Sequence, residues 1–397
     1  MELSDVVVIS AVRTAMGKFG GTLRNVPAYN LGAHAIKESL KRVGLEGMDV
    51  VDEVILGHCR QAGNGPNPVR TASVRAGIPA SIPAHSLNMA CPSGMKALIL
   101  ASQAIRLKEA EVMVVGGMES MSTIPYLLKD ARWEGFKMGD KVLMDGWNDT
   151  IDPLCNMGMG QTAERLQEKY NVSREEQDKF ALESHRKAHE AQINEWFSEE
   201  IVPFEVLHPD TKKPVIFAAD ETIRPDTSLE KLARLKPVFK QNGTVTAGNS
   251  CSMSDGATAL VVTSREKARS LGVEPLFSII SHATAAVDPD VMGEGPSISM
   301  PMVLKDAGMT LSDMDLIEVN EAFAVQILAN EMNLKWDRSK LNIHGGAIAL
   351  GHPTGISGAR ILVTLYYALR RIDKEIGIAG ICGGGGVTTA MVIKREK

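Results

Sequence analysis

At about 150 residues per domain, a chain of 397 residues is long enough for two or three folding units. Its 43 basic and 48 acidic residues leave a net charge of −5, which argues against non-specific binding to nucleic acid or to an anionic membrane. No run approaches the roughly 18 consecutive apolar residues of a membrane-spanning helix. Residues 1–10 show no leader pattern, and the five cysteines are too scattered for a disulfide framework. We therefore expect a cytoplasmic protein with free thiols.

The beginning of the chain alternates between strand and helix patterns. Residues 6–10 form a short β-branched run, residues 31–43 have the apolar spacing of a helix, and residues 51–56 are again strand-like. Such alternation predicts an α/β fold in which helices cover both faces of a sheet.

A similar pattern recurs near the end of the chain, at an offset of about 260 positions. Residues 40–44 resemble 304–308, and residues 91–94 (Cys-Pro-Ser-Gly) resemble 352–355 (His-Pro-Thr-Gly). Each tetrapeptide opens an apolar helical run, and each run precedes a strand-like segment that ends in glycine. Matches in the same order predict that the chain consists of two similar halves.

A segment with a different sequence pattern separates these halves. Residues 173–197 have the pattern of a charged amphipathic helix, and Ser173 with Glu176 has capping-box spacing at its start. Residues 203–226 contain several prolines and predict irregular structure. We therefore divide the chain into an N-terminal half (1–120), an inserted loop domain (121–247) and a C-terminal half (248–397).

Cys91 is the strongest single candidate for a chemical role. It stands just before Pro92, and proline is favoured in the first turn of a helix, so the thiol is expected at a helix N-terminus. Backbone N–H groups and the helix dipole there would stabilise a thiolate and lower the thiol pKa. The alternative is a buried structural cysteine.

His352 occupies the position that the duplication pairs with Cys91. If a pseudo-twofold axis relates the halves, equivalent helix N-termini can converge and bring the two side chains together. Cysteine and histidine in contact form an activated nucleophile. Without the duplication, a histidine in this glycine-rich loop would be interpreted as a hydrogen-bonded structural residue.

Two further residues follow predicted strands. Cys382 ends the last apolar strand before four glycines, whose N–H groups could hold an oxyanion; alternatively it is a small strand residue before a turn. Asn320 follows a strand at 315–319, where it either caps the next helix or orients a water or a carbonyl oxygen. The chain carries no zinc, calcium or nucleotide-binding motif, so we expect no metal site.

Together these residues resemble the thiolases. The resemblance is carried by the segments around Cys91 and Cys382 and by five others: 13–15, 116–121, 245–249, 320–323 and 344–355. They occur in family order over nearly the whole chain. The resemblance implies an α/β protein with the thiolase fold, in which two duplicated βαβαβαββ halves form a five-layer core with a loop domain inserted in the first half.

The resemblance also implies an activity. Thiolases cleave a 3-oxoacyl-CoA with coenzyme A into an acyl-CoA and acetyl-CoA, or run the reverse Claisen condensation, for example of two acetyl-CoA to acetoacetyl-CoA. Coenzyme A is then a co-substrate, and no cofactor stays bound. Family resemblance further suggests a homodimer or a homotetramer.

The roles of the motif residues follow from the same resemblance. Cys91 would be the acylated nucleophile, His352 the base that activates it, and Cys382 the acid or base at the α-carbon of acetyl-CoA. Asn320 would hold a water that forms one oxyanion hole with His352. The N–H groups of Cys91 and Gly384 would form the other.

Departures from the family pattern bear on the substrate. Gly158 stands where members that make acetoacetyl-CoA commonly carry a histidine, Pro92 replaces a glycine, and Ile356 replaces a small residue. The absent imidazole predicts room for a longer, branched or aryl acyl group. Contacts with coenzyme A are expected, by resemblance, at Arg224, Ala247, Met159, Met292, Phe323 and Cys251, the last standing where many members have serine.

Two rival interpretations belong to other classes. A ketoacyl synthase that acts on carrier-protein thioesters would share the fold but lack the second catalytic cysteine, so Cys382 argues against it. A non-catalytic thiolase-like protein that binds lipid or a partner chain would be favoured by loss of Cys91, His352 or Cys382, and all three are present.

Overall fold

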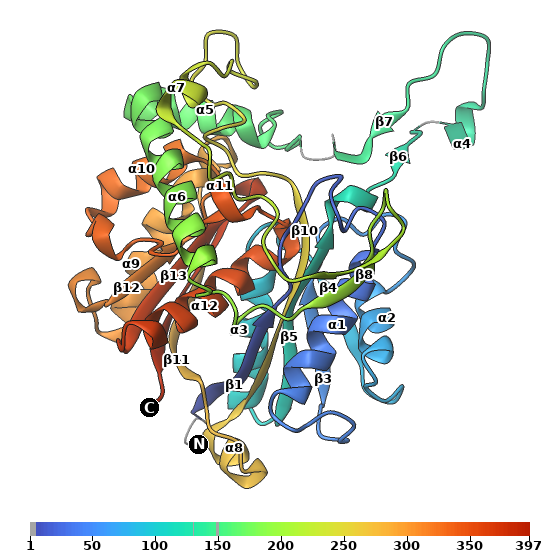
Figure 1. The fold of residues 1–397 in the computed structure, drawn as a ribbon, viewed down its shortest axis with the longest axis vertical. Helices are drawn as coiled ribbons and strands as arrows, with labels where there is room; N and C mark the ends of the chain where they lie inside the picture. Colours follow the sequence, from blue (N-terminus) through green and yellow to red (C-terminus); the bar gives the residue numbers. More distant parts are fainter. Residues whose placement is uncertain (1–4, 130, 148–150) are drawn as a thin grey trace.

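The computed structural model describes residues 5–129, 131–147 and 151–397 (Figure 1). Part of the segment in which no leader is expected, residues 1–4, lies outside the described residues. Within them, ten strands form one mixed sheet. Its order is β12 (Leu316–Val319), β13 (Ile376–Cys382), β14 (Val387–Arg395), β11 (Phe277–Ala286), β1 (Val6–Arg13), β10 (Ser254–Ser264), β5 (Val112–Ser120), β3 (Glu53–Gly57) and β4 (Ala84–Leu87), with β2 (Gly17–Lys18) paired to β10.

The sheet has two similar parts. In the first, β3 is parallel to β4 and β5, and β5 continues antiparallel into β10 and β1. In the second, β12 and β13 are parallel, and β13 continues antiparallel into β14 and β11. The parts meet where β1 pairs with β11, through Val7 with Ser278 and Val8 with Phe277.

Helices cover both faces of each part. α1 (Ala28–Lys41) and α2 (Pro68–Arg75) pack on the outer face of the first part. α3 (Ser93–Arg106) and α12 (Thr354–Arg371) lie between the two parts and contact both. α9 (Gly295–Ala307) and α10 (Ala324–Leu334) pack on the outer face of the second. The core therefore has five layers, and the expected duplication is confirmed.

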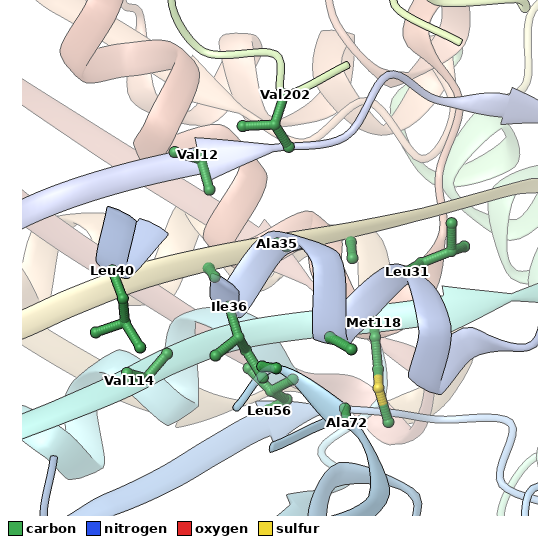
Figure 2. Close-up of a cluster of buried hydrophobic side chains, with 14 of the residues drawn as sticks. Val12, Leu31, Ala35, Ile36, Leu40, Leu56, Ala72, Val114, Met118 and Val202 are labelled. Carbon is green, nitrogen blue, oxygen red and sulfur yellow. The ribbon is translucent and has the colours of Figure 1, made fainter. Parts of the chain in front are cut away.

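The outer helix α1 shows how the sequence determines this packing. Its apolar residues recur at helical spacing, so that Ile36 and Leu40, four residues apart, share one face. Figure 2 shows this face against Val114 of β5 and Leu56 of β3, and all four side chains are buried. Truncating one such leucine to alanine typically costs about 2–5 kcal/mol, so this layer contributes much of the stability.

The two central helices approach closely because each has a glycine at the contact. A Cβ on Gly94 of α3 would lie 2.9 Å from the Cβ of Ala359, and one on Gly358 of α12 would lie 2.7 Å from the backbone nitrogen of Met95. Both distances are shorter than ordinary contacts, so only glycine allows this crossing. The crossing brings the N-terminal ends of α3 and α12 together.

The inserted segment is more regular than expected. The predicted capping box is present: the Ser173 hydroxyl accepts from the Glu176 N–H, and the Glu176 carboxylate accepts from the Ser173 N–H at the start of α6 (Arg174–Ile193). The prediction of irregular structure over 203–226 is wrong, since β8 (Phe204–Leu207) pairs with β9 (Pro214–Phe217). The prolines of this stretch lie outside the strands or at the first strand position, where no ladder hydrogen bond is lost.

The division of the chain at 120 and 247 stays a prediction, but one strand lies in an unexpected place. β10 was assigned to the C-terminal half, yet it pairs with β5 and β1 of the first part. No helix in the described part of the chain is long and apolar enough to cross a membrane. The remaining elements are β6 (Tyr126–Leu127), α4 (Ala131–Glu134), β7 (Met144–Asp145), α5 (Met159–Tyr170), α7 (Leu229–Ala233), α8 (Arg265–Leu271) and α11 (Ala347–Leu350).

Candidate active site

Cys91 lies in a tight turn between β4 and α3. Ala90, directly before it, has a φ of +53°, a left-handed conformation that is unfavourable for residues other than glycine. The Ser93 hydroxyl stabilises the turn, donating to the Ala90 carbonyl at 2.5 Å and accepting from the Met89 N–H at 2.8 Å. The turn places the thiol one residue before Pro92, the N-cap of α3, as the sequence predicts.

His352 contacts Cys91 directly. The imidazole Nε2 lies 3.1 Å from the Cys91 Sγ, although 261 positions separate the two residues. His352 stands one residue before Pro353, the N-cap of α12. The two side chains therefore occupy equivalent places on the two central helices, and the structure brings them together as the duplication predicts.

Ser357 fixes the tautomer of this histidine. Its hydroxyl donates to the Pro353 carbonyl at 3.0 Å, so it accepts from the Nδ1–H of His352 at 2.7 Å. With the proton on Nδ1, the lone pair of Nε2 faces Cys91 and can accept the thiol proton. Ser357 was not predicted from the sequence; the available signal was a hydroxyl five residues after the histidine, in the first turn of the helix.

Asn320 lies beside the same imidazole. Its Nδ2 is 3.4 Å from the Nδ1 of His352, while its Oδ1 is buried with no hydrogen-bond partner among the described residues. A buried oxygen of this kind is unfavourable unless a water or ligand donates to it. The alternative that Asn320 caps the next helix is wrong, because α10 begins after Phe323 without a side-chain cap.

The resting pair is neutral. Burial raises the pKa of the Cys91 thiol to about 11, although the Gly384 N–H and the charge of Arg60 act in the opposite direction. Burial lowers the pKa of His352 to about 4, and the Arg360 guanidinium lowers it further. The expectation that the helix N-terminus lowers the thiol pKa is wrong in its net direction, because desolvation exceeds the effect of the backbone N–H groups. Transfer of the proton must therefore accompany attack on the substrate.

The second cysteine lies close to the first. Cys382 is the last residue of β13 and is 1% exposed. Burial, followed by the neighbouring thiols of Cys91 and Cys251, raises its pKa above the usual range. It is therefore a protonated thiol at neutral pH, which is the form that can donate a proton.

The glycines after Cys382 fold against the nucleophile. A Cβ on Gly383 would lie 2.4 Å from the Cδ of Pro92, so the proline at this position fits because residue 383 is glycine. The next residue, Gly384, donates its N–H toward the sulfur of Cys91, as does the N–H of Cys91 itself. Two backbone donors therefore converge at the reacting atom, where they can stabilise negative charge.

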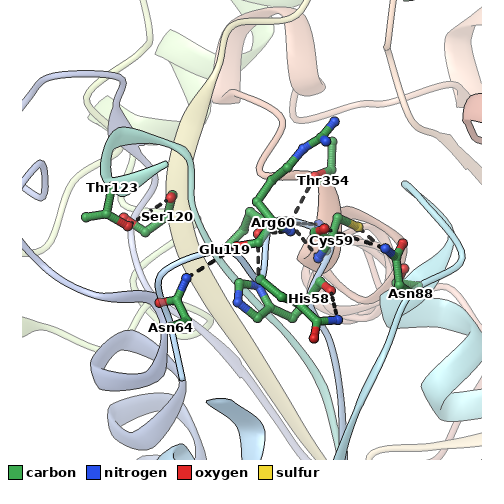
Figure 3. A network of polar contacts seen from close by, with 12 residues as sticks. His58, Cys59, Arg60, Asn64, Asn88, Glu119, Ser120, Thr123 and Thr354 are labelled. Atoms are coloured by element: carbon green, nitrogen blue, oxygen red, sulfur yellow. Dashed lines mark hydrogen bonds and ion pairs between the residues drawn. The ribbon is translucent and has the colours of Figure 1, made fainter. Parts of the chain in front are cut away.

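Glu119, on β5, joins the segment that follows β3 to the start of α12, just after His352 (Figure 3). One carboxylate oxygen accepts from His58 Nδ1 at 2.9 Å and from the Arg60 N–H at 3.0 Å. The other accepts from the N–H groups of Cys59 and Gly355 and from the Thr354 hydroxyl, at 3.0, 2.9 and 2.9 Å. Burial raises the pKa of Glu119, but the His58 ring and these N–H groups outweigh burial and leave it lowered.

No role for Glu119 was predicted from the sequence. Its segment, 116–121, contributes only to the family resemblance. The available signal was a single acidic residue in a strand that is otherwise apolar, since a buried carboxylate requires donors around it. Which donors surround it cannot be read from the sequence, because they come from two distant segments of the chain.

The residues that are expected to contact coenzyme A differ in their solvent exposure. Met292 and Phe323 are buried in the same cluster as Cys382, and Met159 packs against that cluster. The sulfur of Met159 lies 3.2 Å from the position of a Cβ on Gly384. Arg224 and Ala247 are exposed.

Cys251 lies near the nucleophile. Burial and then the neighbouring Cys91 thiol raise the pKa of Cys251 above its usual range. Its backbone N–H donates to the Ala322 carbonyl at 3.0 Å. Among the described residues, no group of three or more His, Cys, Asp or Glu side chains could hold a metal ion.

Comparison with known proteins agrees with this geometry. Residues 6–266 match the thiolase N-terminal domain, and residues 273–395 match the thiolase C-terminal domain. An acetyl-CoA acetyltransferase of Cupriavidus necator is 47% identical over 99% of this chain and 100% of its own length. A probable acetyl-CoA acyltransferase of Staphylococcus aureus is 44% identical over 100% of both.

Solved structures agree equally well. The acetyl-CoA acetyltransferase of Bacillus anthracis superposes with a TM-score of 0.96 at 43% identity, and human mitochondrial 3-ketoacyl-CoA thiolase with a TM-score of 0.95 at 40% identity. Each comparison covers 99% of both chains. The chain belongs to the thiolase family.

Proposed function

We propose that this protein cleaves a 3-oxoacyl-CoA with coenzyme A into an acyl-CoA and acetyl-CoA, and catalyses the reverse Claisen condensation. The observation that carries the proposal is the 3.1 Å contact between Cys91 and His352, with Cys382 close to the same sulfur. The relatives named acetyl-CoA acetyltransferase support the same type of reaction.

In the cleavage direction, His352 accepts the thiol proton while the Cys91 sulfur attacks the 3-oxo carbon of the substrate. The N–H groups of Cys91 and Gly384 stabilise the resulting oxyanion. The bond between the α-carbon and the 3-oxo carbon then breaks, and its electron pair forms the enolate of acetyl-CoA. A water held by Asn320, together with His352, stabilises the enolate oxygen, and Cys382 protonates the α-carbon.

The second half of the reaction regenerates the enzyme. The proton that His352 took from Cys91 first passes to the Cys382 thiolate, so that both groups are restored. Coenzyme A then gives its thiol proton to His352 while its sulfur attacks the thioester on Cys91. The acyl-CoA leaves, and the Cys91 sulfur takes the proton back from His352. Because the intermediate and both products are thioesters, the steps are nearly balanced in energy and the reaction is reversible. Cys91 cannot be acylated and act as the acid or base at the same time, which explains the need for Cys382.

Mass spectrometry after incubation with acetyl-CoA tests these roles. Acetylation is expected at Cys91 in the wild type and in Cys382→Ser. The Cys382→Ser variant should lose condensation and exchange of the α-protons by about 10²–10⁴-fold. Acetylation of Cys382 in place of Cys91, or normal α-proton exchange in Cys382→Ser, would contradict the assignment.

The absent imidazole supports an acyl group larger than acetoacetyl. A Cβ on Gly158 would have only the Gln161 Oε1 within 4 Å, at 3.8 Å. We therefore expect longer or bulkier 3-oxoacyl-CoA substrates to be cleaved at least as well as acetoacetyl-CoA. A steep fall in kcat/KM from the four-carbon to the six-carbon substrate would show that other side chains close this space.

A projecting arm supports the assembly of this protein into a homotetramer. The segment with β6, α4 and β7 extends from the body (Figure 1) and exposes large apolar side chains, among them Trp133, Phe136 and Met138. Exposed apolar groups of this size are typical of protein interfaces. Light scattering should give the mass of four chains for the wild type, and the mass of two chains for a Trp133→Ser/Phe136→Ser variant.

The five free thiols support a location in the cytoplasm, because free thiols persist in a reducing compartment.

A further inference from the structure

Arg60 is a cation close to the nucleophile. It follows β3, and its backbone N–H donates to Glu119, but its side chain extends away from that carboxylate (Figure 3). Among the residues that the structure describes, no carboxylate lies within 4.0 Å of its guanidinium. Its Nε is buried and has no hydrogen-bond partner there.

Two observations place this side chain near the nucleophile and the inserted segment. The guanidinium carbon lies 5.3 Å from the centre of the Trp147 ring, which belongs to the inserted segment. Its charge is near enough to Cys91 to act on the thiol pKa, in the lowering direction. The preceding residue, Cys59, touches the nucleophile turn, with its Sγ 3.2 Å from the Ala90 carbonyl oxygen.

Three described carboxylates, Glu119 and one on each side of Trp147 in the sequence, accept hydrogen bonds from other groups. Glu119 accepts from His58 and from both chain segments described above. Asp145 accepts from the Trp147 N–H at 3.0 Å, and Asp152 accepts from the Gly385 N–H at 2.8 Å. Among the described residues, none of these carboxylates pairs with the guanidinium, which is open to a ligand.

The position of Arg60 near Cys91 indicates which part of a CoA thioester its guanidinium can meet. When the sulfur of coenzyme A is near Cys91, the full pantetheine arm separates it from the phosphates. A cation that acts on the Cys91 thiol is therefore too close to the reacting sulfur to meet those phosphates.

We infer that Arg60 binds a carboxylate at the end of the acyl chain, so that the preferred substrate is the CoA monothioester of a 3-oxo dicarboxylic acid. This inference rests on the proposed thiolase function. A guanidinium can hold a carboxylate through two parallel hydrogen bonds. The Trp147 ring orients the guanidinium through a cation–π contact before substrate binds.

The test compares two substrates of equal carbon number. 3-Oxoadipyl-CoA ends in a carboxylate, and 3-oxohexanoyl-CoA ends in a methyl group. In the wild type, kcat/KM should be higher for 3-oxoadipyl-CoA. In Arg60→Gln the ratio of the two kcat/KM values should fall about 10- to 100-fold, the range for loss of a charged hydrogen bond, and Arg60→Lys should restore part of it.

Comparing the ratio of the two kcat/KM values cancels any effect of Arg60 on the reactivity of Cys91, because both substrates react with the same thiol. The matched control is Arg75→Gln, because Arg75 also stacks on an aromatic ring, 4.7 Å from the centre of Tyr29. Its ratio should equal that of the wild type. If Arg60→Gln weakens both substrates alike, or the wild type prefers 3-oxohexanoyl-CoA, the inference is wrong.

A second measurement needs no variant. Wild-type Cys91 should be acylated faster by succinyl-CoA than by butyryl-CoA, which has the same chain length without the carboxylate. Equal rates of acylation would contradict the inference.

Failure of the proposed thiolase function would give a different result. In that case the wild type would cleave none of these substrates, acetoacetyl-CoA included, and Cys91 would remain unacylated.

Discussion

At the residue scale, burial determines the reactivity of Cys91 more than its place at a helix end. With the thiol pKa raised to about 11 and the His352 pKa lowered to about 4, neither group is charged at neutral pH. At pH 7 only about one thiol in ten thousand is then a thiolate. Acylation therefore depends on His352 accepting the proton during attack, and not on a preformed ion pair.

This leads to a prediction for alkylation of the free enzyme. The rate of carbamidomethylation of Cys91 by iodoacetamide should rise about tenfold per pH unit between pH 7 and 9.5, because the thiolate fraction rises in that way below the pKa. Peptide mass spectrometry measures the rate at Cys91. A plateau near pH 7 would indicate a thiolate and imidazolium pair instead.

Glu119 should be essential to the shape of the site. Glu119→Gln removes the charge and turns an NH₂ group toward one of the two sets of donors. Either the N–H groups of Cys59 and Gly355 or that of Arg60 then lose their acceptor. We expect a loss of about 3–5 kcal/mol in the free energy of unfolding, measured by urea denaturation, with a lower kcat. The control is Glu111→Gln, at an exposed ion pair with Lys267, which should change stability by less than about 0.5 kcal/mol. Equal effects of both substitutions would refute this role.

At the scale of elements, the crossing of α3 and α12 brings the reacting pair together. Gly94→Ala would place a methyl group 2.9 Å from Ala359, and overpacking of this kind costs about 1–3 kcal/mol. We expect a lower urea midpoint and a lower rate of Cys91 acetylation. Gly158→Ala is the control for stability, because its φ of −72° suits alanine and its surroundings are open. A Gly94→Ala variant with wild-type stability would show that the helices can separate without cost.

The elements also show what the sequence could and could not predict. The duplication predicted that Cys91 and His352 meet, because equivalent positions of two similar halves are related by symmetry. It could not predict that β10 joins the sheet of the first half, since strand order depends on contacts between distant segments. Nor could it give the net pKa of Cys91, because burial of the thiol depends on the packing of several segments around the turn.

At the scale of the whole molecule, buried neutral histidines link stability to pH. His352, His185 on α6 and His344 before α11 lie in different parts of the chain, and burial is the main cause of the lowered pKa of each. The pKa is lowered to about 4 for His352 and His185, and to about 3 for His344. Each histidine is therefore neutral in the folded protein at pH values where it would be protonated in the unfolded chain.

The sign of the effect follows from this difference. Above pH 6.5 both states are neutral and the histidines do not change stability with pH. As the pH falls from 6.5 toward 4, the unfolded chain binds protons that the folded protein does not, and each of His352 and His185 costs about 3 kcal/mol over this range. We therefore expect the urea midpoint to fall steeply between pH 6.5 and 4. In His344→Gln the fall should be shallower, because one of these groups no longer titrates, whereas His85→Gln, at an exposed histidine paired with Glu53, should leave the slope unchanged. A midpoint that stays constant down to pH 4 would mean that these histidines are solvated in the folded protein.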